Sequence, residues 1–373
     1  MHLYIHIPFC RQACHYCDFH FSTNIANKRA IVEAIAREIV LQKTYLSAAP
    51  IETVYFGGGT PSMLDRSELE LILQTIRQHF EVISDPEFTL EANPDDLSET
   101  KLQQLFDAGI NRLSIGIQSF NDAHLTFLNR IHSAFEAENC VNTARNIGIK
   151  NISIDLIYAI PAPDHSILHG DLQKAFSLNV SHISAYCLTI EPQTAFGSWL
   201  KKKKIKPIDE EFAAQQFEIL VKTLAENGFE QYEISNFARN EQYSRHNSSY
   251  WKQRPYLGVG PSAHSYNGIS RAFNVANNAK YLQAIHENVI PATLEILSAA
   301  DQTNEYVLTG LRTKWGVNKD KLELLSEGKF FSTQRTELEK IKDFGWIRED
   351  SETLILTESG KLFADRIASD LFI

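Results

Sequence analysis

The sequence of 373 residues predicts an α/β fold in which six strand–helix units form a partial barrel, followed by a mainly α-helical C-terminal region. Three observations predict this fold. Short apolar runs alternate with helical patterns through about the first 190 residues, which is typical of repeated β–α units around a parallel sheet. Each predicted strand alternates apolar with polar side chains. The alternation of predicted strands and helices then stops near residue 205.

Each predicted strand has one polar face, although buried parallel strands are ordinarily apolar on both faces. The strands cover residues 3–7, 53–56, 87–92, 112–118, 152–158 and 182–188. The helical patterns between them cover residues 28–42, 66–80, 99–108, 135–147 and 167–178. If helices cover the apolar faces, the polar faces meet in a shared interior. The residues expected there include Tyr4, Glu91, Gln118 and Asp155. An antiparallel sheet with one face in water is the alternative, but long helical patterns separate the strands.

The sequence pattern divides the chain into three predicted parts. Residues 1–205 form the partial barrel. Residues 206–290 begin with a helix, are then rich in Tyr, Asn, Ser and Gly, and are expected to cover the barrel. Residues 291–373 are expected to form a small helical domain with a winged-helix-like hairpin. This domain has no basic stripe, so we do not expect it to bind DNA.

The composition excludes several classes of protein. A net charge of −10 argues against broad binding of nucleic acids or anionic membranes, which favour a basic surface. No run of about 18 apolar residues is present, so an integral membrane protein is not expected. The first residues, MHLYIHIPFC, lack the basic start and the cleavage site of a signal peptide. A cytoplasmic location is therefore expected.

Three of the five cysteines, Cys10, Cys14 and Cys17, lie within eight residues directly after the first predicted strand. A disulfide scaffold would have denser and even-numbered cysteines. A zinc site needs four ligands, and His15 or His20 could supply the fourth. An iron–sulfur cubane held by three thiolates keeps one iron open, which can chelate the amine and carboxylate of S-adenosylmethionine (SAM). The spacing favours a [4Fe–4S] cluster, with zinc and chance as alternatives.

The two other cysteines, Cys140 and Cys187, fall within a predicted helix and on the apolar side of a predicted strand. We expect both to be buried structural thiols. A glycine run, Gly57–Gly59, follows the second predicted strand and precedes Thr60. Glycines let the backbone approach a ligand closely, so this run could bind the methionyl group of SAM; a tight turn is the alternative. No Lys-Ser/Thr pair follows it, which excludes a phosphate-binding P-loop.

The cysteine motif, with Tyr16 before its third cysteine, resembles the radical SAM signature, and LYIHIPFCRQACHYCDF resembles the anaerobic coproporphyrinogen III oxidase family. Further matching strings follow in order: VYFGGGTPSML, LEANPDD, RLSIGIQSFND, LNRIH, SIDLIYAIP, YEISNFAR and HNSSYW. Together they extend from residue 3 to about residue 270. The resemblance implies a radical SAM barrel with a [4Fe–4S] cluster on the three cysteines.

The resemblance also implies a set of SAM-binding residues. They are Tyr4, Tyr16, Gly58, Gly59, Thr60, Glu91, Gln118, Arg130 and Asp155. Glu91 and Asp155 suit ribose hydroxyls as hydrogen-bond acceptors, and Arg130 suits a carboxylate as a bidentate donor. A satisfied polar group in the core is the alternative for each residue taken singly.

Two departures from the oxidase pattern resemble the HemW branch of this family. The oxidases carry a further cysteine two residues after the third cluster cysteine, where this chain has Phe19. They also carry an N-terminal extension, whereas this chain starts two residues before its first predicted strand. The HemW branch implies heme chaperones rather than decarboxylating oxidases.

The segment HNSSYW, residues 246–251, also resembles that branch and implies a heme-binding site. A neutral imidazole of His246 could serve as an axial ligand of heme iron. Tyr250 and Trp251 offer flat aromatic surfaces for a porphyrin, with Asn247 beside them. A core histidine among packing aromatics is the alternative, and His264 is another candidate ligand.

These observations predict a heme chaperone that carries a SAM-chelating [4Fe–4S] cluster and delivers heme to acceptor hemoproteins. The expected partners are heme, hemoproteins of respiratory or other cytosol-facing type, and a second copy of the chain in a homodimer. The alternative function is a radical SAM enzyme that decarboxylates coproporphyrinogen III oxidatively. A zinc-stabilised binding module is a third hypothesis.

Overall fold

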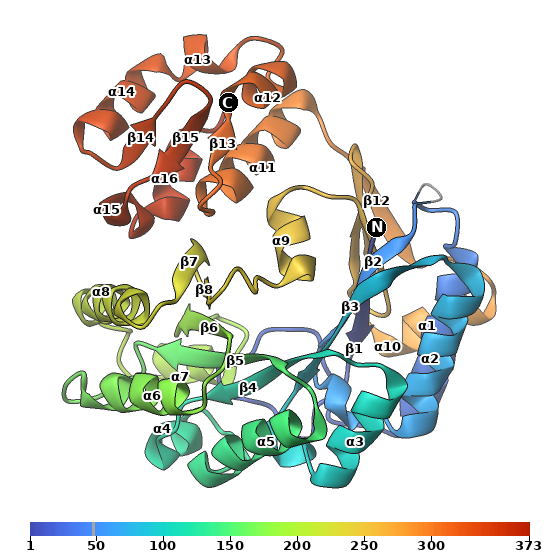
Figure 1. The fold of residues 1–373 in the computed structure, drawn as a ribbon. Coiled ribbons are helices and arrows are strands. Elements are labelled where there is room, and N and C mark those ends of the chain that lie inside the picture. The colour runs from blue at the N-terminus through green and yellow to red at the C-terminus, as the bar shows by residue number, and fades with distance from the viewer. Residues whose placement is uncertain (47–48) are drawn as a thin grey trace.

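A computed structural model describes residues 1–46 and 49–373 of the chain (Figure 1). Six parallel strands form the middle of the main sheet: β1 (His2–Ile7), β2 (Ile51–Gly58), β3 (Val82–Ala92), β4 (Arg112–Gln118), β5 (Asn151–Tyr158) and β6 (His182–Cys187). The helices that follow them are α1 (Lys28–Leu41), α2 (Arg66–His79), α3 (Glu99–Ala108), α4 (Asp122–Phe127), α5 (Ala134–Ile147) and α6 (Ser166–Ser177). Two 3₁₀ turns, η1 (Pro61–Met63) and η2 (Pro94–Asp96), follow β2 and β3. The predicted parallel α/β architecture is confirmed.

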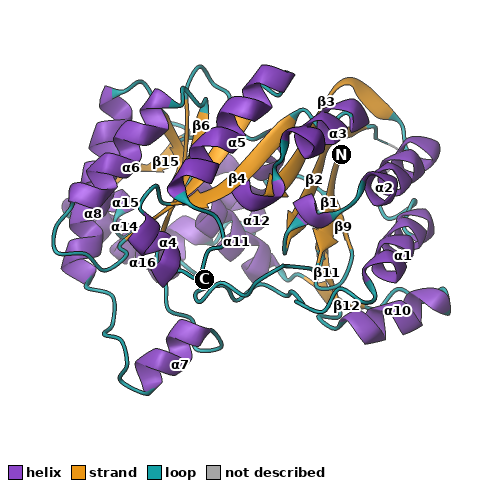
Figure 2. Ribbon diagram, turned by 90° about the horizontal axis from the view of Figure 1, so that it is seen from below, coloured by secondary structure: helices purple, strands orange, loops and turns teal. Residues whose placement is uncertain are grey.

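The helices lie outside the curved sheet, as Figure 2 shows for α1, α2, α3, α5 and α6. Local sequence signals set their ends. Asp65 and Ser133 begin α2 and α5 with capping boxes. Gly109 and Gly148 end α3 and α5 in the left-handed conformation, where a glycine has no steric penalty. The apolar faces of strands and helices form one large core, so the polar strand faces are left for the interior.

The strands after residue 205 extend the same sheet at both of its edges. They are β7 (Glu230–Glu233), β8 (Asn236–Ala238), β9 (Tyr256–Val259), β10 (His264–Tyr266), β11 (Ser270–Asn274) and β12 (Ala292–Ile296). The order across the sheet is β12-β11-β10-β9-β1-β2-β3-β4-β5-β6-β8-β7. The helix α7 (Ala195–Lys201) precedes this region, whose helices are α8 (Glu210–Glu226), α9 (Arg245–Trp251) and α10 (Asn278–His286). The segment 206–290 therefore supplies strands to the sheet as well as helices.

One buried carboxylate, that of Glu38 on α1, holds the β9–β11 edge against the barrel. Its oxygens accept hydrogen bonds from the Tyr281 hydroxyl (2.6 Å), the Gly260 amide (2.7 Å) and the Asn274 side chain (2.7 Å). Burial raises the pKa of Glu38 above its ordinary value. The buried group stays compatible with the core because its hydrogen-bonding capacity is satisfied.

The chain after β12 forms a small domain with its own apolar core. Its elements are α11 (Ala299–Leu311), β13 (Val317–Asn318), α12 (Lys319–Leu325), α13 (Phe330–Thr333), α14 (Arg335–Asp343), β14 (Ile347–Glu349), β15 (Thr353–Leu356), α15 (Glu358–Lys361) and α16 (Ala364–Asp370). β14 and β15 pair as an antiparallel hairpin, and β13 pairs with β15. Within residues 1–46 and 49–373, no helix is both long and apolar enough to cross a membrane.

Candidate functional site

A cavity of about 400 Å³ opens at the carboxyl ends of the barrel strands. Gly58, Gln118 and Cys187, which end β2, β4 and β6, all line it. The three clustered cysteines line it as well, together with every predicted SAM residue except Tyr4: Cys10, Cys14, Cys17, Tyr16, Gly58, Gly59, Thr60, Glu91, Gln118, Arg130 and Asp155. The structure therefore brings the candidate cluster ligands and the candidate SAM residues into one cavity.

The cysteine loop is fixed by hydrogen bonds that reach two of its sulfurs. The Thr60 hydroxyl donates to Cys10 Sγ (3.4 Å), and Arg130 Nη1 donates to Cys14 Sγ (3.4 Å). Burial raises the pKa of Cys10 to about 11 and that of Cys17 to about 12, so both groups are neutral thiols in the absence of iron. Iron ligation requires thiolates, and the positive charge of a metal supplies the stabilisation that burial removes. Three free thiols with donors at two sulfurs fit a cluster held by three cysteines.

The two histidines considered as a fourth zinc ligand face away from this cavity. His15 Nδ1 contacts the Phe127 carbonyl (2.9 Å), and His20 Nε2 contacts Asn278 Oδ1 (2.9 Å). Neither residue lines the cavity. In the described part of the chain, no three His, Cys, Asp or Glu side chains gather closely enough to hold a single metal ion. The donor set suits a multinuclear cluster better than zinc, because each thiolate of a cluster binds a different iron.

The glycine run lets the end of β2 pass close to the cysteine loop. Gly58 has a φ of +104° and donates its amide hydrogen to Glu91 Oε2 (3.2 Å). A Cβ atom on Gly59 would lie 2.6 Å from the carbonyl oxygen of Phe9, the residue before Cys10. The glycine run therefore allows the backbone at the end of β2 to approach the backbone at Phe9, and it also forms part of the cavity wall.

Arg130 is oriented by two neutral acceptors and so presents its charge to the cavity. Its Nη2 donates to Asn93 Oδ1 (2.6 Å) and to the Gly116 carbonyl (2.7 Å). A Cβ on Gly116 would lie 3.3 Å from that nitrogen, so the glycine permits the approach. Gln118 has a φ of +69° at a shift of register between β4 and β5. This irregular strand end brings the Gln118 side chain to the cavity, where it contributes to the lining.

Two carboxylates face the cavity from neighbouring parts of the barrel. Glu91 Oε1 accepts a hydrogen bond from the Tyr55 hydroxyl (2.7 Å), and Asp155 Oδ1 accepts one from the Ser114 hydroxyl (3.2 Å). Burial raises the pKa of Glu91 to about 7 and that of Asp155 to about 6. Because each carboxylate oxygen can accept two hydrogen bonds, both groups retain acceptor capacity for a hydroxyl-bearing ligand such as a ribose.

Replacing Glu91 by glutamine is expected to remove part of the pH dependence of stability. The folded protein holds the Glu91 proton up to about pH 7, whereas the unfolded chain loses it near 4.5. Stability therefore falls as the pH rises from 4.5 to 7, by about 2 kcal/mol if water in the cavity screens part of the charge. Urea unfolding of the cofactor-free protein at several pH values should show a flatter profile for the variant. An unchanged profile would contradict this role of Glu91.

Two predicted positions differ in how they relate to the cavity. Tyr4 is on the predicted polar face and lies deeper in the lumen, stacked on Tyr55 at 6.1 Å and near His6 Nδ1 (3.3 Å), so its contact with SAM stays a prediction. Cys187 was expected to be a buried structural thiol; the structure corrects this, because it is only half-buried and lines the cavity. The last residue of a strand is no longer held to the alternation of the strand, which explains the error. Cys140 is buried in α5 as expected.

The predicted heme segment forms α9, at the opposite end of the barrel from the cysteines. The amides of Arg245 and His246 donate to Glu87 Oε2 and Oε1, both at 3.0 Å, and His246 Nδ1 contacts Thr53 Oγ1 (2.6 Å). Thr53 pairs with His2, the first residue of β1. β1 alone spans about 20 Å, so α9 closes the amino ends of the strands at a distance from the cluster loop.

His246 is fully buried, and both of its ring nitrogens have partners. Nδ1 contacts Thr53, Nε2 contacts the Tyr250 hydroxyl (2.8 Å), and the ring stacks on Tyr55 at 5.0 Å. Burial places the pKa of His246 well below its ordinary value, which keeps the ring neutral. Axial ligation of heme iron by His246 stays a prediction, and it requires one ring nitrogen to give up its hydrogen bond and bind iron instead.

The other residues of the segment are more accessible. Asn247, Tyr250 and Trp251 are half-buried. The guanidinium of Arg312, at the end of α11, lies 5.6 Å from the centre of the Trp251 ring. The segment therefore adjoins the small domain on one side and the amino ends of the barrel strands on the other.

Comparisons with known proteins show the family of this chain. The Radical SAM superfamily profile matches residues 4–169, and the HemN C-terminal domain profile matches residues 297–363. The heme chaperone HemW of Bacillus subtilis is 35% identical over 98% of this chain and 97% of its own length. The heme chaperone HemW of Escherichia coli is 30% identical over 100% of this chain and 97% of its own length.

A solved structure of coproporphyrinogen III oxidase (HemN) from Escherichia coli superposes with a TM-score of 0.85. The alignment covers 99% of this chain and 89% of that one at 23% identity, which supports the shared fold alone. Fold similarity does not separate chaperone from oxidase. The full-length identity to the HemW proteins does separate the families, and this chain belongs to the HemW family of radical SAM proteins.

Proposed function

We propose that this protein is a heme chaperone that holds a SAM-chelating [4Fe–4S] cluster in its barrel and delivers heme to acceptor hemoproteins. The observation that carries the proposal is the similarity to curated heme chaperones, which extends over 98% of this chain. The intact cavity supports the cofactor part of it, since the three thiols and the candidate SAM residues line one space.

Cys10, Cys14 and Cys17 would hold the cluster, which supplies an open iron for SAM and an electron when it is reduced. The chain's own residues divide the binding of SAM between them. The Gly58–Thr60 backbone and Arg130 suit the amine and carboxylate of the methionyl group. Glu91 and Asp155 suit the ribose hydroxyls as acceptors, because both residues line the cavity and a carboxylate oxygen can accept more than one hydrogen bond.

The alternative is oxidative decarboxylation of coproporphyrinogen III. The position at which the oxidase pattern has a further cysteine is occupied by Phe19, whose side chain is 67% exposed at the cavity. An apolar ring there supplies neither a thiol nor a hydrogen-bond donor, so the oxidase chemistry loses one of its expected groups. This difference favours the chaperone.

An anaerobic reconstitution decides between the two functions. The protein with reduced cluster, SAM and coproporphyrinogen III is expected to form no protoporphyrinogen, while the same preparation binds heme with a change in absorbance. Formation of protoporphyrinogen over many turnovers would establish the oxidase. Failure of the reconstituted protein to bind heme would contradict the chaperone.

Replacing His246 by alanine is expected to destabilise the fold, because it removes two buried hydrogen bonds and a stacked ring. We expect the midpoint of thermal unfolding to fall by about 5 °C. If His246 is the axial ligand, the folded variant also loses the absorption spectrum of histidine-ligated heme. An unchanged spectrum would remove His246 as the ligand.

A further inference from the structure

Arg112, the first residue of β4, carries a buried positive charge to which the fold gives no hydrogen-bonded partner. Its side chain is 1% exposed. The guanidinium nitrogens Nε and Nη1 are buried and form no hydrogen bond with the residues that the structure describes. A buried charge is costly unless a countercharge lies close to it. The charges around Arg112 therefore decide what this residue does.

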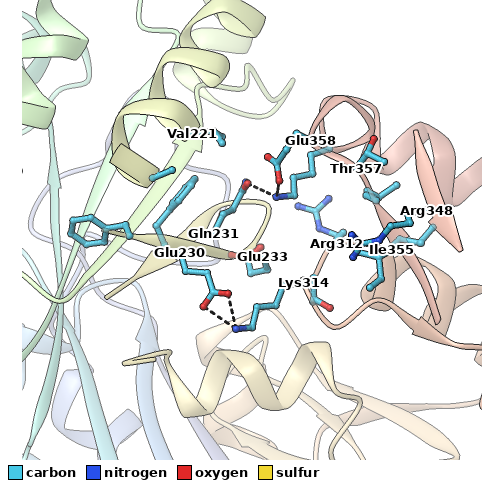
Figure 3. A pocket seen from close by; sticks show the side chains of 17 residues that line it. Val221, Glu230, Gln231, Glu233, Arg312, Lys314, Arg348, Ile355, Thr357 and Glu358 are labelled. Atoms are coloured by element: carbon cyan, nitrogen blue, oxygen red, sulfur yellow. Dashed lines mark hydrogen bonds and ion pairs between the residues drawn. The ribbon is translucent and has the colours of Figure 1, made fainter. Parts of the chain in front are cut away.

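The cations of a second cavity show the more usual situation. This interdomain cavity, of about 570 Å³, lies between the barrel and the small domain (Figure 3). Lys314 Nζ contacts both carboxylate oxygens of Glu230 at 2.8 Å there, and Arg348 is exposed to solvent. A carboxylate or water thus compensates each of these two charges. Arg112 has neither, because it is enclosed in the barrel.

Arg112 lies one level below the two carboxylates of the cysteine cavity, on the same face of the sheet. Side chains alternate along β4, so Arg112 and Ser114 share the inner face. Ser114 is paired in register with Glu91, and its hydroxyl donates to Asp155 Oδ1 (3.2 Å). Two residues along a strand cover about 7 Å, which an arginine side chain can span. The positive charge of Arg112 is therefore close to both carboxylates.

A third carboxylate of the lumen, that of Glu87, has other partners. It lies at the barrel floor, which is formed by the amino ends of the strands, and it accepts the amides of Arg245 and His246, each at 3.0 Å. Burial lowers the pKa of His246 and of His182 well below the ordinary value, so both rings at the floor are neutral. Glu87 is thus engaged by the start of α9, which leaves Glu91 and Asp155 as the carboxylates on which Arg112 acts.

Other titratable groups surround these two carboxylates from β1, β2, β6, α9, the cysteine loop and the segment after α4. They are Tyr4, Tyr55, Tyr186, Tyr250, Cys10 and Arg130. Burial raises the pKa of each of these tyrosines and of Cys10, so they are neutral in the absence of iron. Arg130 is charged, but it already donates to Asn93, to the Gly116 carbonyl and to Cys14 Sγ. Arg112 is therefore the cation whose charge is left for Glu91 and Asp155.

We propose that Arg112 is a positioning residue of the SAM site, whose buried charge keeps Glu91 and Asp155 ionised so that both accept the ribose hydroxyls near neutral pH. This inference rests on the SAM-binding part of the proposed function. An ionised carboxylate only accepts hydrogen bonds, whereas a protonated one has to place its own proton. The negative charges also attract SAM, which carries a net positive charge.

The two carboxyls are poised so that the loss of one positive charge changes their state. Burial raises the pKa of Glu91 to about 7 and that of Asp155 to about 6, although the charge of Arg112 lowers both. Without Arg112 both pKa values rise further, and the carboxyls are protonated at neutral pH. SAM binding that needs ionised carboxylates is then lost at a higher pH than in wild type.

SAM titration of the full-length reconstituted protein from about pH 5.5 to about pH 9 tests this inference. Arg112→Met is expected to move the fall in affinity to higher pH by about one unit, which weakens SAM binding about fivefold at pH 7 and less than about twofold at pH 9. Arg112→Lys keeps the charge and should restore the wild-type profile. Arg66→Met is the matched control, because Arg66 is exposed on α2 and pairs with Glu70; its profile should equal that of wild type.

A second measurement needs neither cluster nor SAM, and it also decides the matter if Arg112→Met does not fold. Glu91→Gln combined with Asp155→Asn leaves Arg112 without both nearby countercharges. At about pH 8 we expect the midpoint of thermal unfolding of this double variant to fall by more than the sum of the two single effects.

The outcomes separate this inference from the proposed function. An unchanged pH profile in a folded Arg112→Met protein, or additive effects of the two carboxylate substitutions, would overturn the role of Arg112. Wild-type protein that holds a cluster but binds no SAM at any pH would instead contradict the SAM-binding part of the proposed function.

Discussion

Replacing Cys14 by alanine is expected to lower the iron bound by the reconstituted protein from about four atoms per chain to less than one. Cys14 lines the cavity and its sulfur accepts a hydrogen bond from Arg130, so its loss removes both a thiolate and the contact that orients it. Two thiolates leave two irons of a cubane without protein ligands. Iron and sulfide analysis under anaerobic conditions, with the broad absorption near 400 nm, measures the effect.

Cys140→Ala is the matched control for this experiment. Cys140 is buried within α5 and does not line the cavity, so the variant should bind as much iron as wild type. Retention of four irons by Cys14→Ala would contradict the assignment of the cluster to the cysteine loop. Equal loss in both variants would show that reconstitution reports folding rather than ligation.

Replacing Gly59 by alanine is expected to destabilise the protein by about 3 kcal/mol or more, because the added methyl group meets backbone atoms. The new Cβ would lie 2.6 Å from the Phe9 carbonyl oxygen, 2.8 Å from the Phe9 nitrogen and 2.9 Å from the Ile7 carbonyl oxygen. Side chains could turn away, but here β2 and the cysteine loop must separate. We therefore expect SAM binding to be lost together with stability.

Gly170→Ala is expected to have the opposite effect on stability. Gly170 lies in α6, and a Cβ there meets no atom within 4 Å. Alanine in a helix is favoured over glycine, so this variant should be stabilised by about 0.5–1 kcal/mol. Urea unfolding of both variants measures the difference. A Gly59→Ala protein within 1 kcal/mol of wild type would show that the close approach of the two backbones is not needed.

The alternation of side chains along the strands predicted much of the site. Glu91, Gln118 and Asp155 were placed on polar strand faces, and all three line the cavity. Tyr4 satisfies the same alternation but lies at a deeper level of the lumen. The two-residue repeat of a strand shows on which face a side chain lies. It does not show at which level along the barrel axis the side chain meets its neighbours, since that level depends on how the strands are staggered.

The surroundings of the HNSSYW segment could not be predicted from the local sequence. A histidine next to aromatic residues has the same sequence whether it is exposed or buried. His246 is buried because Thr53, which is 193 residues away in the chain, and Tyr55 meet it at the barrel floor. Only the packing of α9 on β2 brings these residues together, so the sequence could not show that both ring nitrogens have partners.

The sequence by itself predicted the parallel α/β barrel and the three-thiol loop, because strand alternation and cysteine spacing are local signals. The resemblance of its ordered strings to a known family indicated the family. The tertiary structure decided what depends on contacts between distant segments. It placed α9 at the opposite end of the barrel from the cysteines, brought Cys187 into the cavity and formed the interdomain cavity around Arg348. These positions follow from how the strands stagger and how the small domain docks, which no single stretch of sequence encodes.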